Sequence, residues 1–192
     1  MTNPLAGLSM AFNQFGTVAS SPYLPTDQQL EGASGVSFRT PRFKRARDIT
    51  GPLKLYLVAS TSAPDTNWHA KVIDVAPGGK QSVITEGSLR ASHRALNKKR
   101  STRLRPYHPH TSRAAVPAGR FVPYEIEIWP TAYRVKAGHR LLLRVTSTDL
   151  PTHLPGWIRL NKANLAATTV QVDRPAINRV RLKGSYLLVP YS

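Results

Sequence analysis

The segment from Glu125 to Pro151 constrains the fold more than any other part of the chain. It contains an alternating stretch that ends at Trp129-Pro130, a corner at Lys136-Ala137-Gly138, and a second stretch from Leu141 to Ser147 whose residues 141–145 are apolar except at Arg144. Alternation of apolar and polar residues has the period of a half-buried strand, and a short run that is apolar on both faces is typical of a central strand. The segment therefore predicts two strands joined by a corner, and the second strand is expected to be central because it is apolar on both faces from Leu141 to Val145 except at Arg144.

Short strand patterns recur along the rest of the chain. The strands expected from these patterns cover residues 53–57, 68–75, 81–85, 122–128, 141–147, 168–172, 178–182 and 186–189. The sequence Ala76-Pro77-Gly78-Gly79 predicts a tight hairpin between the second and third of them. The chain contains 16 prolines and 12 glycines, and no helical stripe exceeds two turns. This pattern favours an all-β, antiparallel sandwich or jelly roll.

The length of 192 residues is that of one domain with an arm. Residues 1–26 show no clear hydrophobic period and are predicted to form an irregular N-terminal arm or linker. Residues 27–192 are predicted to form the sandwich domain. Within it, residues 97–120 are basic, contain proline and lack strand character. They are expected to form a long loop, and a loop of that length is usually functional or disordered.

Several classes of protein are disfavoured by composition. The sequence has no run of about 18 apolar residues, so no membrane span is expected. Residues 1–17 have no basic region ahead of an apolar block, so no secretory signal is visible and a cytoplasmic location is the default expectation. The absence of cysteine excludes disulfides and zinc–thiolate sites.

The formal net charge of +17 is concentrated in two segments. Residues 39–47 carry five Lys or Arg residues and residues 90–113 carry eight, while no acidic residue occurs between Glu86 and Glu125. Such a field attracts anions, including nucleic acid, acidic glycans and anionic lipid headgroups. The candidate anion-binding residues are Lys98, Lys99, Arg100, Arg103 and Arg105.

The basic loop, residues 90–113, matches no motif that reads base edges. Tyr107 offers one stacking surface beside the cations. Sequence-specific nucleic-acid binding is therefore disfavoured. The favoured interpretations are nonspecific contact with a polyanion, a solvated run of charges, or docking on an acidic partner.

The sequence carries no evident catalytic centre. A nucleophile elbow would read G-x-S-x-G between a strand and a helix. The nearest match, Gly7-Leu8-Ser9-Met10-Ala11, lacks the second glycine and a preceding strand. His108 and His110 are two residues apart, without the helical spacing or neighbouring carboxylates of a metal site, and are expected to be surface residues. His139 is expected to be a structural hydrogen-bonding residue. The sequence thus predicts no catalytic residue, no metal site and no cofactor.

Five phrases in order resemble one known domain. They are Asp48-Ile49-Thr50-Gly51-Pro52 opening onto LKLYLVAST, Ala63 to Trp68 followed by KVIDVAPGG, Glu86 to Arg94, the segment Glu125 to Pro151, and Gly184 to Pro190. Together they resemble the C-terminal β-sandwich of X-Pro dipeptidyl-peptidases and cocaine-esterase-type (CocE/NonD) serine hydrolases. The resemblance extends over about Asp27 to Pro190 and includes Arg105-Pro106-Tyr107-His108-Pro109-His110. It is loose between Pro151 and Asn178, and the basic excess is not a hallmark of the family.

The resemblance implies a jelly-roll sandwich of the galactose-binding-like type that lacks the Ser-Asp-His triad. In that family the triad belongs to an α/β-hydrolase domain that hydrolyses ester or amide acyl groups, so this chain alone is predicted to be inactive. The implied partner is such a catalytic domain, in cis or as a separate chain, and homo-oligomers are possible. Candidate domain-interface residues are Trp129, Tyr133 and Trp157. The alternatives are a stand-alone β-sandwich module that binds a glycan or polyanion, and a basic nucleic-acid binder.

Overall fold

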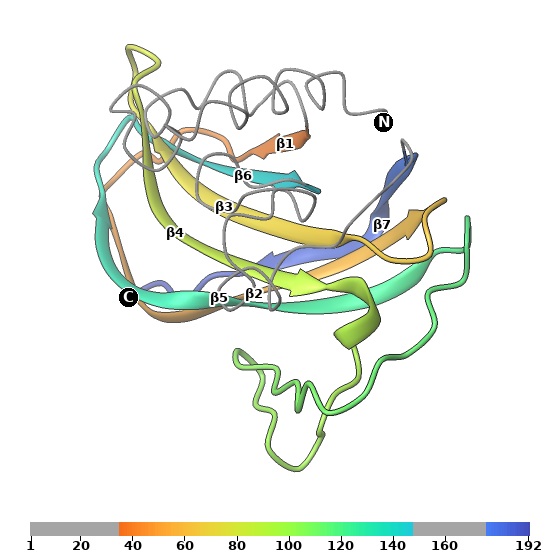
Figure 1. The fold of residues 1–192 in the computed structure, drawn as a ribbon. Coiled ribbons are helices and arrows are strands. Elements are labelled where there is room, and N and C mark those ends of the chain that lie inside the picture. The colour runs from red at the N-terminus through yellow and green to blue at the C-terminus, as the bar shows by residue number, and fades with distance from the viewer. Residues whose placement is uncertain (1–34, 148–175) are drawn as a thin grey trace, which may run out of the picture.

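The computed structural model of the chain describes residues 35–147 and 176–192. In this part seven strands form two antiparallel sheets, and a single 3-10 turn is the only helical element there (Figure 1). The elements are β1 (Val36–Arg39), β2 (Arg47–Thr61), β3 (Asn67–Val75), β4 (Gln81–Arg90), η3 (Ala91–His93), β5 (Val122–Val135), β6 (Arg140–Thr146) and β7 (Asn178–Leu188). The all-β prediction is confirmed. The N-terminal arm and the strand expected at 168–172 lie outside the described residues.

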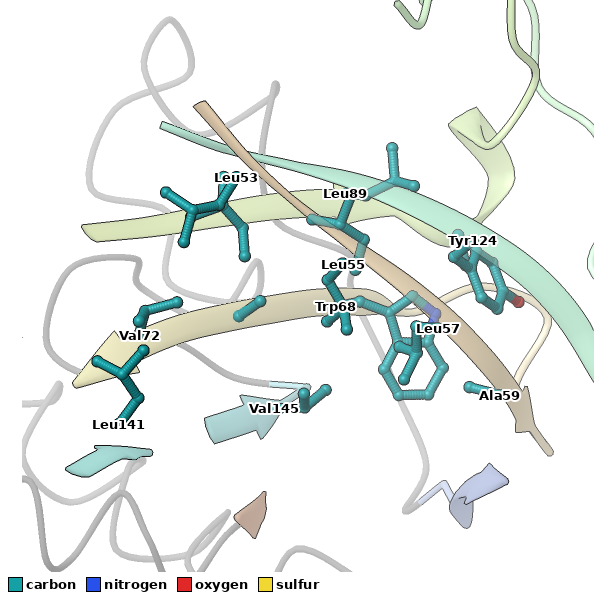
Figure 2. Packing of buried hydrophobic residues seen from close by; sticks show 14 of the residues in the cluster. Leu53, Leu55, Leu57, Ala59, Trp68, Val72, Leu89, Tyr124, Leu141 and Val145 are labelled. Atoms are coloured by element: carbon teal, nitrogen blue, oxygen red, sulfur yellow. The ribbon is translucent and has the colours of Figure 1, made fainter. Parts of the chain in front are cut away.

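The strands divide into a four-stranded sheet, β1-β6-β3-β4, and a three-stranded sheet, β5-β2-β7. Figure 1 shows β1, β6 and β3 in one layer above β7, β2 and β5 in the other. The core lies between the layers, where Trp68 of β3 meets Tyr124 of β5 with ring centroids 5.6 Å apart. Leu55 and Leu57 of β2 belong to the same buried cluster and lie beside Trp68 in Figure 2. The apolar faces of two amphipathic sheets therefore bury each other, as in other sandwiches.

The central position expected for the strand after the corner is confirmed. β6 pairs with β1 on one side and β3 on the other, so that Leu143 is opposite both Phe38 and Val72. Every residue of β3 is buried, as its apolar residues at both parities predict. The hairpin between β3 and β4 is also confirmed, and Gly79 in its turn has φ +88°, a backbone conformation that favours glycine.

Strands β5 and β6 are adjacent in sequence but belong to different sheets. Arg140 and Arg144 of β6 are therefore not cross-strand neighbours of Glu125 and Glu127 of β5. The corner takes the chain from one sheet to the other, and Gly138 within it has φ +80°. Glu125 instead forms an ion pair with Lys54 of β2, at 2.8 Å. Pairing on a sheet requires strands that share that sheet.

A cavity of about 550 Å³ lies between the sheets near β1 and β7. Its walls are mainly apolar and include Leu57 of β2, Leu143 of β6 and Leu187 of β7. Leu143 is accordingly only partly buried, although its strand is central. Within residues 35–147 and 176–192, no helix is long and apolar enough to cross a membrane.

Candidate interaction surface on the basic loop

The basic loop, residues 90–113, leaves β4 and is closed at its neck by hydrogen bonds. In Figure 1 it extends away from the two sheets before the chain returns to β5. The amide of Ala114 donates to the carbonyl oxygen of Ser92 at 2.7 Å. The guanidinium of Arg94 donates to the carbonyl oxygens of Ala91, Ala114 and Ala115. One side chain thus holds the outgoing and returning segments together.

Asp65, in the turn before β3, anchors the start of the loop. Its carboxylate accepts hydrogen bonds from Arg90 Nε at 2.8 Å, from Ser92 Oγ at 2.6 Å, and from the amides of Thr66 and Ser92, both at 2.9 Å. Burial alone would raise the pKa of Asp65, but the hydrogen bonds from Ser92, Arg90 and Thr66 outweigh it and hold the pKa below its ordinary value. Asp65 thus accepts backbone N–H bonds beside a turn, a common role for a short carboxylate at such a position.

The distal part of the loop is ordered by its own hydrogen bonds. Asn97 Oδ1 accepts from the amides of Lys99 and Arg100, and the Asn97 amide donates to the carbonyl oxygen of Tyr107 at 2.9 Å. Ser101 Oγ bonds both the Asn97 carbonyl oxygen and the Tyr107 amide. Internal bonding of this kind is typical of compact, frequently functional surface loops.

His108 fastens the loop to the sandwich. Its Nδ1 lies 3.1 Å from the carbonyl oxygen of Ala95, and its Nε2 lies 2.7 Å from the carbonyl oxygen of Glu125. Glu125 belongs to β5, which is an edge strand of its sheet. His108 therefore occupies a backbone acceptor on a sheet edge that would otherwise be available to another chain.

The five cationic candidates are all exposed on this loop. Arg105 Nε lies 3.3 Å from Glu127 Oε1, and the Arg100 guanidinium lies 3.7 Å from the centre of the Tyr107 ring. The Arg100 contact covers one face of Tyr107, so only the other face remains for stacking. Lys98, Lys99 and Arg103 have no ion pair with any residue of the described part of the chain. Of the five candidates, these three cations are therefore the most available for an ionic contact with another molecule.

Sequence reasoning did not foresee a histidine pair at the neck. The Nδ1 atoms of His93 and His110 lie 3.0 Å apart although the residues are 17 positions apart in sequence. His110 is the only described residue other than glycine with a positive φ, at +55°. Across residues 35–147 and 176–192 no group of three or more histidine or acidic side chains is placed to hold a metal ion. No sequence pattern connects His93 with His110, because the contact depends on the path of the loop.

The three domain-interface candidates lie in different environments. Trp129 on β5 is 68% exposed, while its carbonyl oxygen accepts a hydrogen bond from Thr85 Oγ1 of β4. Tyr133 is half-buried and donates to Asp74 Oδ2 at 2.8 Å; burial and this bond raise the pKa of Tyr133 to about 12. Trp157 lies outside the described residues. Of the two described candidates, Trp129 therefore offers the freer apolar surface.

His139 has the structural role expected of it. Its Nδ1 lies 2.9 Å from both carboxylate oxygens of Asp74, which is itself buried. Asp74 belongs to β3 and also accepts the Tyr133 hydroxyl from β5. The carboxylate therefore links the two sheets at the corner that leads into β6.

Comparisons with known proteins agree on one family. The profile of the family described as X-Pro dipeptidyl-peptidase C-terminal non-catalytic domain matches residues 6–185. A Mycobacterium bovis protein named as a serine esterase is 27% identical over 164 residues, which cover 79% of this chain and 25% of that protein. The cocaine esterase of a Rhodococcus species is 27% identical over 106 residues, covering 55% of this chain and 16% of the esterase. The chain thus spans about a quarter or less of the length of these relatives.

Solved structures give the same fold. A CocE/NonD family hydrolase from Staphylococcus aureus superposes with a TM-score of 0.64 at 22% identity, over 82% of this chain and 30% of that one. An α-amino acid ester hydrolase superposes with a TM-score of 0.63 at 20% identity, over 87% of this chain and 27% of that one. In each case the similarity is confined to a minor part of a larger hydrolase.

Proposed function

The chain belongs to the family of X-Pro dipeptidyl-peptidase C-terminal non-catalytic domains, and from that premise we propose that it is the accessory domain of a CocE/NonD-type serine hydrolase. It packs on an α/β-hydrolase domain, in cis or as a separate chain, and supports the geometry that hydrolyses an ester or amide acyl group. The single observation that carries this proposal is the family match over residues 6–185, found in a sequence without a G-x-S-x-G nucleophile elbow.

The architecture in this proposal is a galactose-binding-like jelly roll formed by residues 27–192, with residues 1–26 as an arm. The two antiparallel sheets, β1-β6-β3-β4 and β5-β2-β7, support it. A jelly roll consists of two such sheets with strands that alternate between the layers, and the crossing from β5 to β6 is one such change of layer.

The proposed contact with the catalytic domain is centred on Trp129. An exposed indole on a sheet edge supplies a large apolar area and a polar N–H, a combination that is enriched at protein interfaces. Tyr133 is less available because its hydroxyl is bonded to Asp74. Trp157 is retained as a third member of this interface.

The proposal is tested by measuring activity with and without a catalytic partner. The isolated chain is expected to show no hydrolysis of p-nitrophenyl acetate above background and no labelling by a fluorophosphonate probe. The reason is that it lacks a nucleophile, a general base and a residue that orients the base. An α/β-hydrolase domain encoded beside this chain is expected to co-purify with it and to lose activity or stability without it. Stoichiometric labelling of the isolated chain, or a neighbouring hydrolase domain that neither binds it nor changes in its presence, would contradict the proposal.

A second candidate function rests on the exposed cations of the basic loop. Lys98, Lys99 and Arg103 project from an internally hydrogen-bonded loop, so binding an anion there requires little ordering of the backbone. We propose nonspecific polyanion binding at this surface as the alternative function. It requires phosphate or sulfate contacts only, without base readout.

A further inference from the structure

The contact between His93 and His110 accommodates only one hydrogen atom. A neutral imidazole carries one N–H and one lone pair, so two Nδ1 atoms 3.0 Å apart need one donor and one acceptor. His93 Nε2 is buried and has no hydrogen-bond partner within the described part of the chain. With His93 as the Nδ1 donor, that buried atom carries no hydrogen. The arrangement without an unpaired buried N–H is therefore the neutral pair in which His93 donates to His110.

Adding a proton to either ring disturbs this arrangement. A proton on His93 would be placed on the buried Nε2. A proton on His110 gives it hydrogens on both nitrogens, so that His93 must accept at Nδ1 and move its own hydrogen to the same buried Nε2. Both cases leave an unpaired buried N–H, which is costly in free energy. The contact is consequently compatible with neutral rings and is weakened by protonation.

The surroundings of the two rings also favour their neutral forms. Burial is the largest cause that lowers the pKa of His93, followed by the positive charges of Arg90 and Arg113, with a smaller contribution from His108, while Asp65 opposes them. The pKa of His110 is lowered by burial and then by His108 and His93. These groups come from the end of β4, the basic loop and the turn before β3, and together they favour neutral rings in the closed arrangement.

We propose that the His93–His110 contact is a pH-sensitive latch that holds the returning segment of the basic loop against η3 and releases it on acidification. A released histidine has its ordinary pKa of 6.5, above its pKa in the latch. The stabilisation is thus fully present above pH 6.5 and is lost as the pH falls from 6.5 through the lower pKa of the closed form. Release also lets His110 leave its left-handed backbone conformation.

The released region is limited to the loop beyond the neck. The Ala114–Ser92 backbone bond and the Arg94 contacts involve no histidine and remain in place. Opening therefore frees the backbone of residues 110–113, which are already exposed, and adds positive charge to a surface that is already cationic, while His108 keeps its contacts with Ala95 and Glu125 and the sandwich is unchanged.

Two measurements on the full chain test the latch. NMR titration of the histidine ring signals is expected to give a pKa below 6.5 for both His93 and His110. Amide hydrogen exchange of residues 110–113, corrected for the intrinsic effect of pH, is expected to be faster at low than at neutral pH, because release of the contact removes a restraint on their backbone.

The decisive variant is His110→Asn. Asparagine tolerates the left-handed conformation and bonds His93 as donor or acceptor, but it does not titrate, so the corrected exchange is expected to keep only the weaker pH dependence that His93 itself contributes. Lys99→Asn is the matched control, because it lowers the loop charge without touching the pair and is expected to keep the dependence. A His110→Asn chain with undiminished pH dependence, or a wild-type pKa of 6.5 or higher for either ring, would overturn the proposal.

Discussion

Arg90 Nε and Asp65 Oδ2 form an ion pair of 2.8 Å at the point where β4 ends and the basic loop begins. Both side chains are largely shielded from solvent, with exposed fractions of 16% and 14%. The same carboxylate also receives three hydrogen bonds from Ser92 and Thr66. A partly buried carboxylate with this many donors contributes more than an exposed surface pair.

Replacing Asp65 with Asn is expected to lower the free energy of unfolding by about 1.5–3 kcal/mol at neutral pH, since hydrogen bonds to an ionised group are lost. The folded-state pKa of Asp65 lies below 3.8, so its contribution is present above pH 3.8 and disappears as the pH falls through the folded-state value. Urea unfolding at a series of pH values is therefore expected to show a weaker acid dependence in Asp65→Asn. Asp48→Asn is the control, because its pair with Arg134 is exposed and is expected to contribute less than about 1 kcal/mol. Equal losses in the two variants would contradict the role assigned to Asp65.

Trp129→Ala is expected to weaken binding to the catalytic domain by about tenfold or more while leaving the unfolding midpoint nearly unchanged. The indole is 68% exposed in the isolated chain, so its removal leaves no cavity in the core, whereas buried aromatic anchors dominate interface energetics. Titration calorimetry and thermal unfolding measure the two effects separately. Tyr186→Ala on β7 is the matched control, as that ring is 48% exposed in the same sheet but on the opposite edge strand. Unchanged binding in Trp129→Ala would remove this residue from the interface.

Ile126→Ala is expected to cost about 2–5 kcal/mol of unfolding free energy, whereas Leu143→Ala is expected to cost less. Ile126 is fully buried in the main cluster, while Leu143 is only partly buried and lines an existing cavity. Truncation beside an existing cavity removes fewer contacts than truncation within close packing. Chemical unfolding of the two variants checks the order, and a larger loss in Leu143→Ala would mean that the cavity is filled in the folded protein.

Replacing Lys98, Lys99 and Arg103 together with Gln is expected to weaken heparin or DNA binding and to flatten its salt dependence. Each phosphate contact contributes about 0.9 to the slope of log affinity against log salt, so the slope is expected to fall by up to about 3. The variant leaves the Arg105–Glu127 pair and the Arg100–Tyr107 contact in place.

The matched control replaces Lys44, Arg45 and Arg47, which removes the same charge from the other basic segment. If the two triple variants behave alike, binding follows net charge and the loop is not a site. Neutralising all five loop cations is expected to lower the affinity more than the triple variant does. The strands are expected to stay folded in that variant, because the loop lies outside them.

The sequence by itself determined the local elements of this protein. The alternation in β2 and β5, the apolar residues on both faces of β3 and β6, and the glycine turn between β3 and β4 each depend on neighbours within a few residues. Residue spacing reports directly on such features, because side chains alternate along a strand and glycine permits positive φ. The basic, strand-free character of residues 97–120 is local in the same sense, and the exposure of its cations follows from it.

Only the tertiary structure decided which of these elements meet. It placed β5 and β6 in different sheets, so that Glu125 pairs with Lys54 and not with an arginine of β6. It also gathered Asp65, Arg90 and Ser92 at the neck of the loop, and it brought His93 within 3.0 Å of His110. These contacts join residues far apart along the chain, and they depend on the free energy of packing the whole sandwich. Periodicity within one strand or loop carries no information about that free energy.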